Sequence, residues 1–169
     1  MFYETCIDPN LKIKDLKDVY ALPEMVVVNK FNEDGVKSFR EQFEKALVSK
    51  QEIIPVVIDS YGGEAYSVLA MVDIIKNSPV PVATIVSGKA MSCGAILFTC
   101  GTNGHRYVGP NATVLIHDVS SWMYGKIEDM KIDLKETKRL NKLVYHLMAE
   151  NCGHHKDYFL DIIKEKGNR

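Results

Sequence analysis

The sequence predicts an α/β protein built on a largely parallel sheet. Two observations support this class: short runs of branched apolar residues recur along the chain, and they alternate with segments whose apolar residues follow helical spacing. Where strands and helices alternate in this way, the strands run parallel and the helices cover the sheet. In such sheets, catalytic and binding groups gather where strands end and helices begin.

Five short segments have the composition of strands, with turn residues beside them. They cover residues 25–28, 53–58, 82–86, 107–108 and 113–116. The run from Ile53 to Ile58 is apolar throughout. We therefore expect a strand that is buried on both faces, with Pro55 near its start.

Four segments carry apolar residues at helical spacing. They cover residues 36–47, 65–76, 94–99 and 126–151. The second of these is apolar nearly all round, which predicts burial. Two turns rich in small residues, 60–64 and 88–94, each follow a strand and precede a helix. His117 follows the strand at 113–116, so we expect it to lie near these turns.

Length and charge narrow the classes of protein. The chain has 169 residues, which fits one domain over residues 1–169, with 1–23 as an irregular N-terminal segment. With 21 basic and 22 acidic residues, the net charge of −1 argues against a nucleic-acid binder. No apolar run is long enough for a membrane span, and the N-terminus does not resemble a targeting peptide. We expect a soluble cytoplasmic protein.

The four cysteines do not have the spacing of a metal site. Cys93 and Cys100 lie in an apolar segment and are expected to be reduced core residues, while Cys6 and Cys152 stand alone. No metal is expected.

Ser92 stands among small residues at the start of an expected helix. The free N–H groups and the dipole at a helix start favour a developing oxyanion. A serine hydroxyl is a weak nucleophile without a base, and His117 is the best candidate for that base. From residue type and spacing alone, the alternative stays open that Ser92 only caps a helix and that His117 is an ordinary loop histidine.

The turn Asp59-Ser60-Tyr61-Gly62-Gly63 is a second candidate feature. Paired glycines permit a sharp turn and the close approach of another backbone. The segment either supplies an oxyanion donor and a strand edge that binds an extended peptide, or it is only a turn. No GxGxxG or P-loop sequence occurs, so a nucleotide site is not expected. Trp122, Met123 and Tyr124 either wall a substrate cleft or pack at a contact, and packing is the simpler interpretation.

Three segments resemble motifs of one family. Residues 59–63 resemble the turn [N/D]-S-P-G-G, residues 88–95 resemble the segment G-x-A-A-S-M-G-A, and residues 109–117 resemble L-P-N-S-x-x-M-I-H. The motifs occur in order, with 29 positions from Gly63 to Ser92 and 25 from Ser92 to His117. Over about residues 25–153 the sequence is similar to the proteolytic subunits of the Clp protease, the ClpP family of serine peptidases.

The resemblance implies a fold, a reaction and an assembly. The fold is the β-β-α spiral shared by ClpP and crotonase proteins, with a protruding handle helix at residues 125–153. Ser92 is the nucleophile, His117 the general base, and the N–H groups of Gly63 and Cys93 form the oxyanion hole. Partners are a polypeptide substrate, further copies in stacked rings of the heptamer or tetradecamer type, and an AAA+ unfoldase. No cofactor, nucleic acid or membrane is implied.

The sequence also departs from the family pattern. Tyr61 replaces a proline, Cys93 replaces a methionine, and the family's aspartate position falls on Lys166. The third triad member is therefore unknown, with Asp161 and Asp157 as nearby candidates. Arg169 ends the chain before the family's C-terminal segment, so the resemblance allows for a truncated C-terminal part.

These departures leave two further functions beside an ATP-dependent, self-compartmentalised serine endopeptidase. One is a catalytically impaired ClpP-like ring subunit with an assembly or peptide-binding role, which the missing aspartate favours. The other is an acyl-CoA enzyme of the crotonase type, which the ordered serine and histidine argue against.

Overall fold

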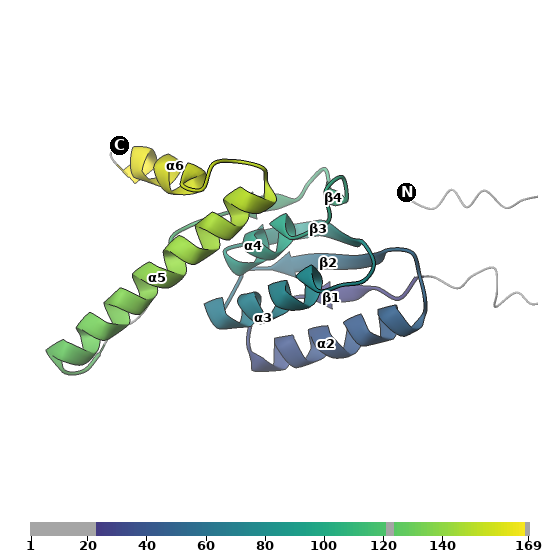
Figure 1. The fold of residues 1–169 in the computed structure, drawn as a ribbon, viewed down its shortest axis with the longest axis horizontal. Helices are drawn as coiled ribbons and strands as arrows, with labels where there is room; N and C mark the ends of the chain where they lie inside the picture. The colour runs from purple at the N-terminus through teal and green to yellow at the C-terminus, as the bar shows by residue number, and fades with distance from the viewer. Residues whose placement is uncertain (1–22, 121–123, 168–169) are drawn as a thin grey trace, which may run out of the picture.

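The computed structural model describes residues 23–120 and 124–167, without the side chains of 166 and 167 (Figure 1). The five expected strands are present as β1 (Val26–Val28), β2 (Ile54–Ser60), β3 (Val82–Met91), β4 (Arg106–Val108) and β5 (Thr113–Leu115). The four expected helices are present as α2 (Glu33–Val48), α3 (Ala65–Lys76), α4 (Cys93–Thr99) and α5 (Ile127–Asn151). The predicted α/β class is confirmed.

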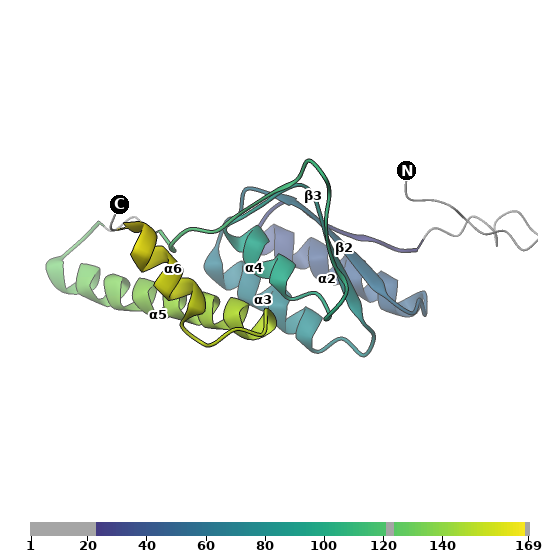
Figure 2. The same cartoon turned by 90° about the horizontal axis from the view of Figure 1, so that it is seen from above.

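The strands form one sheet in which every pair is parallel, in the order β1-β2-β3-β4. The long strand β3 has two neighbours on the same side: Thr84–Val86 pairs with β4, and Lys89–Met91 pairs with β5. Figures 1 and 2 show α2, α3 and α4 on the same face of the sheet. Their apolar residues and the buried residues of β1 to β3 form the core.

Two predictions about β2 and β3 were wrong. Along β2, Val56 and Ile58 are fully buried but Val57 is only half-buried, so one face alone is sealed by helices. The turn predicted from residue 88 is strand as far as Met91, because Lys89–Met91 pairs with β5 and Ala90 also pairs with Ser60 of β2. The pairing of β2 with β3 is irregular here. It has a register shift between Ile58 and Ser60, and Gly88 has a positive φ of 94°.

The buried residues of α5 all lie in its second half, from Leu140 to Ala149. Figures 1 and 2 show the first half extending beyond the sheet and the other helices. Exposed apolar side chains occur along this first half, at Ile127, Ile132 and Leu134. A further helix that the sequence analysis did not predict, α6 (Tyr158–Gly167), packs against α5.

Several other expectations concern particular residues. Cys93, Cys100 and Cys152 are free thiols, and Cys93 is buried as predicted. Tyr124 is fully exposed, whereas Trp122, Met123 and nearly all of the segment 1–23 lie outside the described residues. No helix of residues 23–120 and 124–167 is long and apolar enough to span a bilayer. The same part of the chain holds no group of three or more His, Cys, Asp or Glu side chains arranged to bind a metal ion.

Candidate active site

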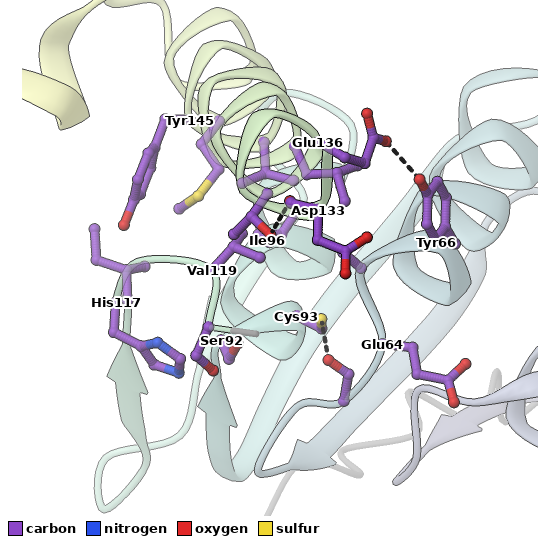
Figure 3. A pocket seen from close by; sticks show the side chains of 18 residues that line it. Glu64, Tyr66, Ser92, Cys93, Ile96, His117, Val119, Asp133, Glu136 and Tyr145 are labelled. Carbon is purple, nitrogen blue, oxygen red and sulfur yellow. Dashed lines mark hydrogen bonds between the residues drawn. The ribbon is translucent and has the colours of Figure 1, made fainter. Parts of the chain in front are cut away.

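Parallel pairing of β3 with β5 brings Ser92 and His117 to one edge of the sheet. Met91, the last residue of β3, lies beside Leu115, the last residue of β5. The N–H of Ser92 donates a hydrogen bond to the carbonyl of Leu115 (2.9 Å). His117 is two residues further on, and both side chains line a cavity of about 520 Å³. In Figure 3 the imidazole of His117 points toward the Ser92 side chain.

Ser92 has an unusual backbone conformation, with φ of 54° and ψ of −117°. This region is favourable for glycine and strained for other residues, and such strain is concentrated at functional sites. The turn is held by α4, since the carbonyl of Ser92 accepts hydrogen bonds from the N–H groups of Ala95 (2.9 Å) and Ile96 (3.2 Å). Its side chain makes no cap for the helix, so the hydroxyl is not engaged in capping, which contradicts the simpler interpretation of this serine.

The two expected oxyanion donors lie in the same cavity as Ser92. Gly63 and Cys93 both line the cavity, and no hydrogen bond among the described residues uses either N–H group. The Cys93 thiol instead donates to the carbonyl of Gly63 (3.2 Å), and burial raises the pKa of that thiol, which keeps it protonated. The N–H of Glu64 donates to the carbonyl of Phe31 (2.8 Å), which fixes the glycine turn beside β1.

His117 is exposed, and its Nδ1 lies 2.6 Å from the backbone carbonyl of Asp118. A carbonyl oxygen can only accept, so Nδ1 carries the proton and Nε2 is left as the acceptor. No hydrogen bond joins Ser92 to His117 across the described cavity. Catalytic hydrogen bonds are often long in structures without substrate, so the absence of a hydrogen bond between Ser92 and His117 does not conflict with a nucleophile–base pair.

The two candidates for the third triad member lie elsewhere. Asp157 Oδ1 is 2.9 Å from Nε2 of His146, and this hydrogen bond lowers the pKa of Asp157. Asp161 lies 3.6 Å from Nζ of Lys164. Neither carboxylate lines the cavity that contains Ser92 and His117. The structure therefore pairs one candidate with a histidine, but with a different histidine from His117.

The rest of the cavity combines an apolar floor with carboxylates. Helix α5 and the loop after β5 contribute apolar side chains, among them Ile116, Leu140, Val144 and Met148. Glu136 accepts hydrogen bonds from Tyr66 (2.5 Å) and Arg139 (2.7 and 2.8 Å), which ties α3 to α5 across the cavity (Figure 3). The bond from Arg139, followed by that from Tyr66, lowers the pKa of Glu136 to about 2.

Tyr61, which replaces the proline of the motif, lies outside this cavity and is exposed. Lys89 Nζ is 4.4 Å from the centroid of its ring and 2.6 Å from Asp59 Oδ1. A cation over a tyrosine ring is attracted by the ring's quadrupole. The aromatic residue therefore packs against the end of β3 and leaves Gly62 free to contact Ser92.

The sequence analysis missed Tyr66, Asp133, Glu136 and Tyr145, which also line the cavity. They lie on α3 and α5, and no sequence pattern marks them as site residues. The packing of α5 against α4 brings Asp133, Glu136 and Tyr145 to the cavity, and Tyr66 reaches it from α3. The helical spacing of Asn141 and Tyr145 could have indicated that they share a face.

A serine at a strained strand-to-helix turn, with unbonded N–H groups and a histidine in the same cavity, is a set of features found in serine hydrolases. A sequence model described as Clp protease matches residues 20–165. The match covers most of the chain, and the chain belongs to the Clp protease family.

Proposed function

We propose that this chain is the proteolytic subunit of a self-compartmentalised serine endopeptidase that cleaves unfolded proteins or peptides. The observation that carries the proposal is the strained turn at Ser92. It holds the hydroxyl in a cavity with His117 and with the unbonded N–H groups of Gly63 and Cys93. Membership of the Clp protease family supports the same reaction class.

The mechanism uses groups that the chain itself supplies. Ser92 Oγ attacks the scissile carbonyl while Nε2 of His117 takes the hydroxyl proton. The N–H groups of Gly63 and Cys93 bind the oxyanion, and the dipole of α4 adds a favourable potential. The protonated imidazole then donates to the leaving amine, and water hydrolyses the acyl-enzyme by the reverse sequence.

The assembly is part of the proposal. The first half of α5 extends from the body and exposes Ile127, Ile132 and Leu134, with exposed fractions of 67%, 66% and 43%. Apolar side chains on an extended helix are suited to burial against another subunit. This helix is proposed to act as the handle between stacked heptameric rings, and an AAA+ unfoldase is proposed to deliver the polypeptide.

Labelling with a fluorophosphonate tests the reaction class. The reagent phosphonylates only an activated serine, so we expect one adduct per chain, mapped by mass spectrometry to Ser92. Protein unfolded in urea is the control and should not react. Absence of the adduct from folded protein, together with an uncleaved fluorogenic peptide, would reject the endopeptidase. It would favour an impaired ring subunit, since neither Asp157 nor Asp161 reaches the cavity.

The cavity also predicts a substrate preference. Asp133 points into the cavity from α5, and no cation pairs with it among the described residues (Figure 3). Glu64 also lines the cavity, and its Oε2 accepts a hydrogen bond from Ser67 (3.0 Å). Carboxylates that line the cavity of Ser92 attract a basic substrate side chain, so we expect peptides with Lys or Arg near the cleaved bond to be preferred.

The Asp133→Asn variant tests this preference with almost no change in shape. An exposed ion pair contributes about 0.2–1 kcal/mol, so we expect KM for a lysine-containing peptide to rise by a factor between about 1.4 and 5. KM for a matched neutral peptide should not change. Asp129→Asn, one turn earlier on α5 and outside the cavity, is the control. An equal effect of Asp133→Asn on both peptides would contradict the preference.

A further inference from the structure

The loop that carries His117 is held by two side chains of α5. Asn141 Oδ1 accepts the N–H of Val119 (2.9 Å), and its Nδ2 donates to Asp118 Oδ1 (3.0 Å). Tyr145 Oη donates to the same carboxylate oxygen (3.2 Å). Asn141 and Tyr145 are one turn apart and therefore share a face of the helix. Three hydrogen bonds thus fix the two residues that follow His117.

Of the two α5 residues that hold this loop, Tyr145 is itself fixed by burial. Tyr145 is 1% exposed and packs in the core, so its hydroxyl has a fixed position. Burial and the adjacent Asp118 carboxylate raise the pKa of Tyr145, which keeps the hydroxyl protonated as a donor. The carboxylate of Asp118 is therefore committed to α5, and only the backbone carbonyl of Asp118 contacts the imidazole of His117.

We propose that Asp118 is the positioning residue for His117, with its backbone carbonyl holding the proton on Nδ1 and its carboxylate tying the loop to Asn141 and Tyr145. This inference rests on the proposed function. A neutral imidazole has two tautomers, and only the form with the proton on Nδ1 presents the Nε2 lone pair to a serine hydroxyl. In the serine protease triad a buried carboxylate selects that form. Here the backbone carbonyl of the next residue selects it.

The tautomer of His117 is the direct test. The full-length protein is prepared with ring-¹⁵N histidine and studied by magic-angle spinning NMR, which tolerates a large assembly. The chain has five histidines, and a His117→Gln variant assigns the resonance of interest. In the unmodified protein, with the imidazole of His117 neutral, we expect the Nδ1–H form. In Asp118→Ala and in the double variant Asn141→Ala/Tyr145→Phe, we expect the Nε2–H form to dominate.

Activity gives a second measure of the positioning of His117. Loss of the orienting carboxylate costs about 10⁴ in a serine protease, so release of this weaker contact should lower kcat by about 10- to 100-fold with KM unchanged. Asp118→Asn keeps both the backbone carbonyl and a side-chain oxygen that accepts from α5, so it should retain the Nδ1–H form and most of the activity. Tyr107→Phe removes an exposed hydroxyl on β4 and is the control for Tyr145→Phe.

The outcomes separate this inference from the function on which it rests. An Nε2–H form in the unmodified protein, or a tautomer that the variants leave unchanged, overturns the positioning role even if peptide is cleaved and Ser92 is labelled. A tautomer that responds as expected supports the positioning role. If peptide is then left uncleaved and Ser92 unlabelled, the endopeptidase alone is rejected, because the NMR signal does not depend on turnover.

Discussion

Replacing Ser92 with alanine should abolish peptide cleavage while the protein keeps its fold and its assembly. Removing the nucleophile of a serine protease lowers kcat by about 10⁶, because only the oxyanion donors and substrate binding remain. The donors proposed here are the backbone N–H groups of Gly63 and Cys93, which the substitution does not remove. The rate of cleavage of a fluorogenic peptide, measured beside the oligomer size by light scattering, checks the expectation.

A second serine controls for the substitution itself. Ser38 lies on the exposed face of α2, away from the cavity, and Ser38→Ala should leave the rate unchanged. If Ser92→Ala retained more than a small fraction of the activity in protein free of contaminating peptidases, another residue would have to be the nucleophile.

The backbone conformation of Ser92 should lower the free energy of unfolding, so that stability is lost where the nucleophile is placed. The φ of 54° strains any residue with a Cβ, by about 1–3 kcal/mol, whereas glycine adopts it freely. Ser92→Gly should therefore have a higher free energy of unfolding than Ser92→Ala, although both are inactive. Equal stability in urea titrations of the two variants would show that the turn stores no strain.

The sequence was sufficient to predict the five strands and the helices α2 to α5, but not α6. Apolar runs and turn residues indicated β3 and β5, and the alternation of strands and helices indicated a largely parallel sheet. The pairing of β3 with β5 is known only from the structure. That pairing brings Ser92 and His117 together. Residue type alone did not favour a catalytic pair over a capping serine and a loop histidine; the order and spacing of the three motifs did.

The contributions of α5 could not be predicted, because they depend on packing between distant segments. The apolar stripe of this helix indicates that one face is buried, but not which partner covers it. Once Tyr145 is in the core, Asn141 reaches the loop after His117, and Glu136 reaches Tyr66 on α3. These contacts connect residues that are 22 and 70 positions apart. Local propensity contains no information about such pairs.

Replacing Gly62 with alanine should nearly abolish activity although Ser92 and His117 themselves are unchanged. The φ of Gly62 is 106°, and a Cβ at this position would lie 2.7 Å from Cβ of Ser92 and 2.9 Å from the carbonyl oxygen of Met91. Neither neighbour can move far, because the N–H of Ser92 is bonded to β5 and its carbonyl to α4. A displacement of about 1 Å at a reacting group costs about 10² in rate. We expect at least that loss in kcat/KM.

Gly104→Ala separates backbone strain from displacement of the nucleophile. Gly104 also has a positive φ, 83°, but a Cβ there would meet no atom within 4 Å, and it lies outside the cavity. Gly104→Ala should lower the free energy of unfolding by about 1–2 kcal/mol, since it forces a Cβ into a left-handed conformation. Gly62→Ala should lower it further, because its Cβ also meets Ser92 and Met91. Only Gly62→Ala should also lower the rate of fluorophosphonate labelling at Ser92. If the two variants lost activity equally, the defect would arise from global destabilisation. If neither lost it, the close contact between the glycine turn and Ser92 would have no part in placing the nucleophile.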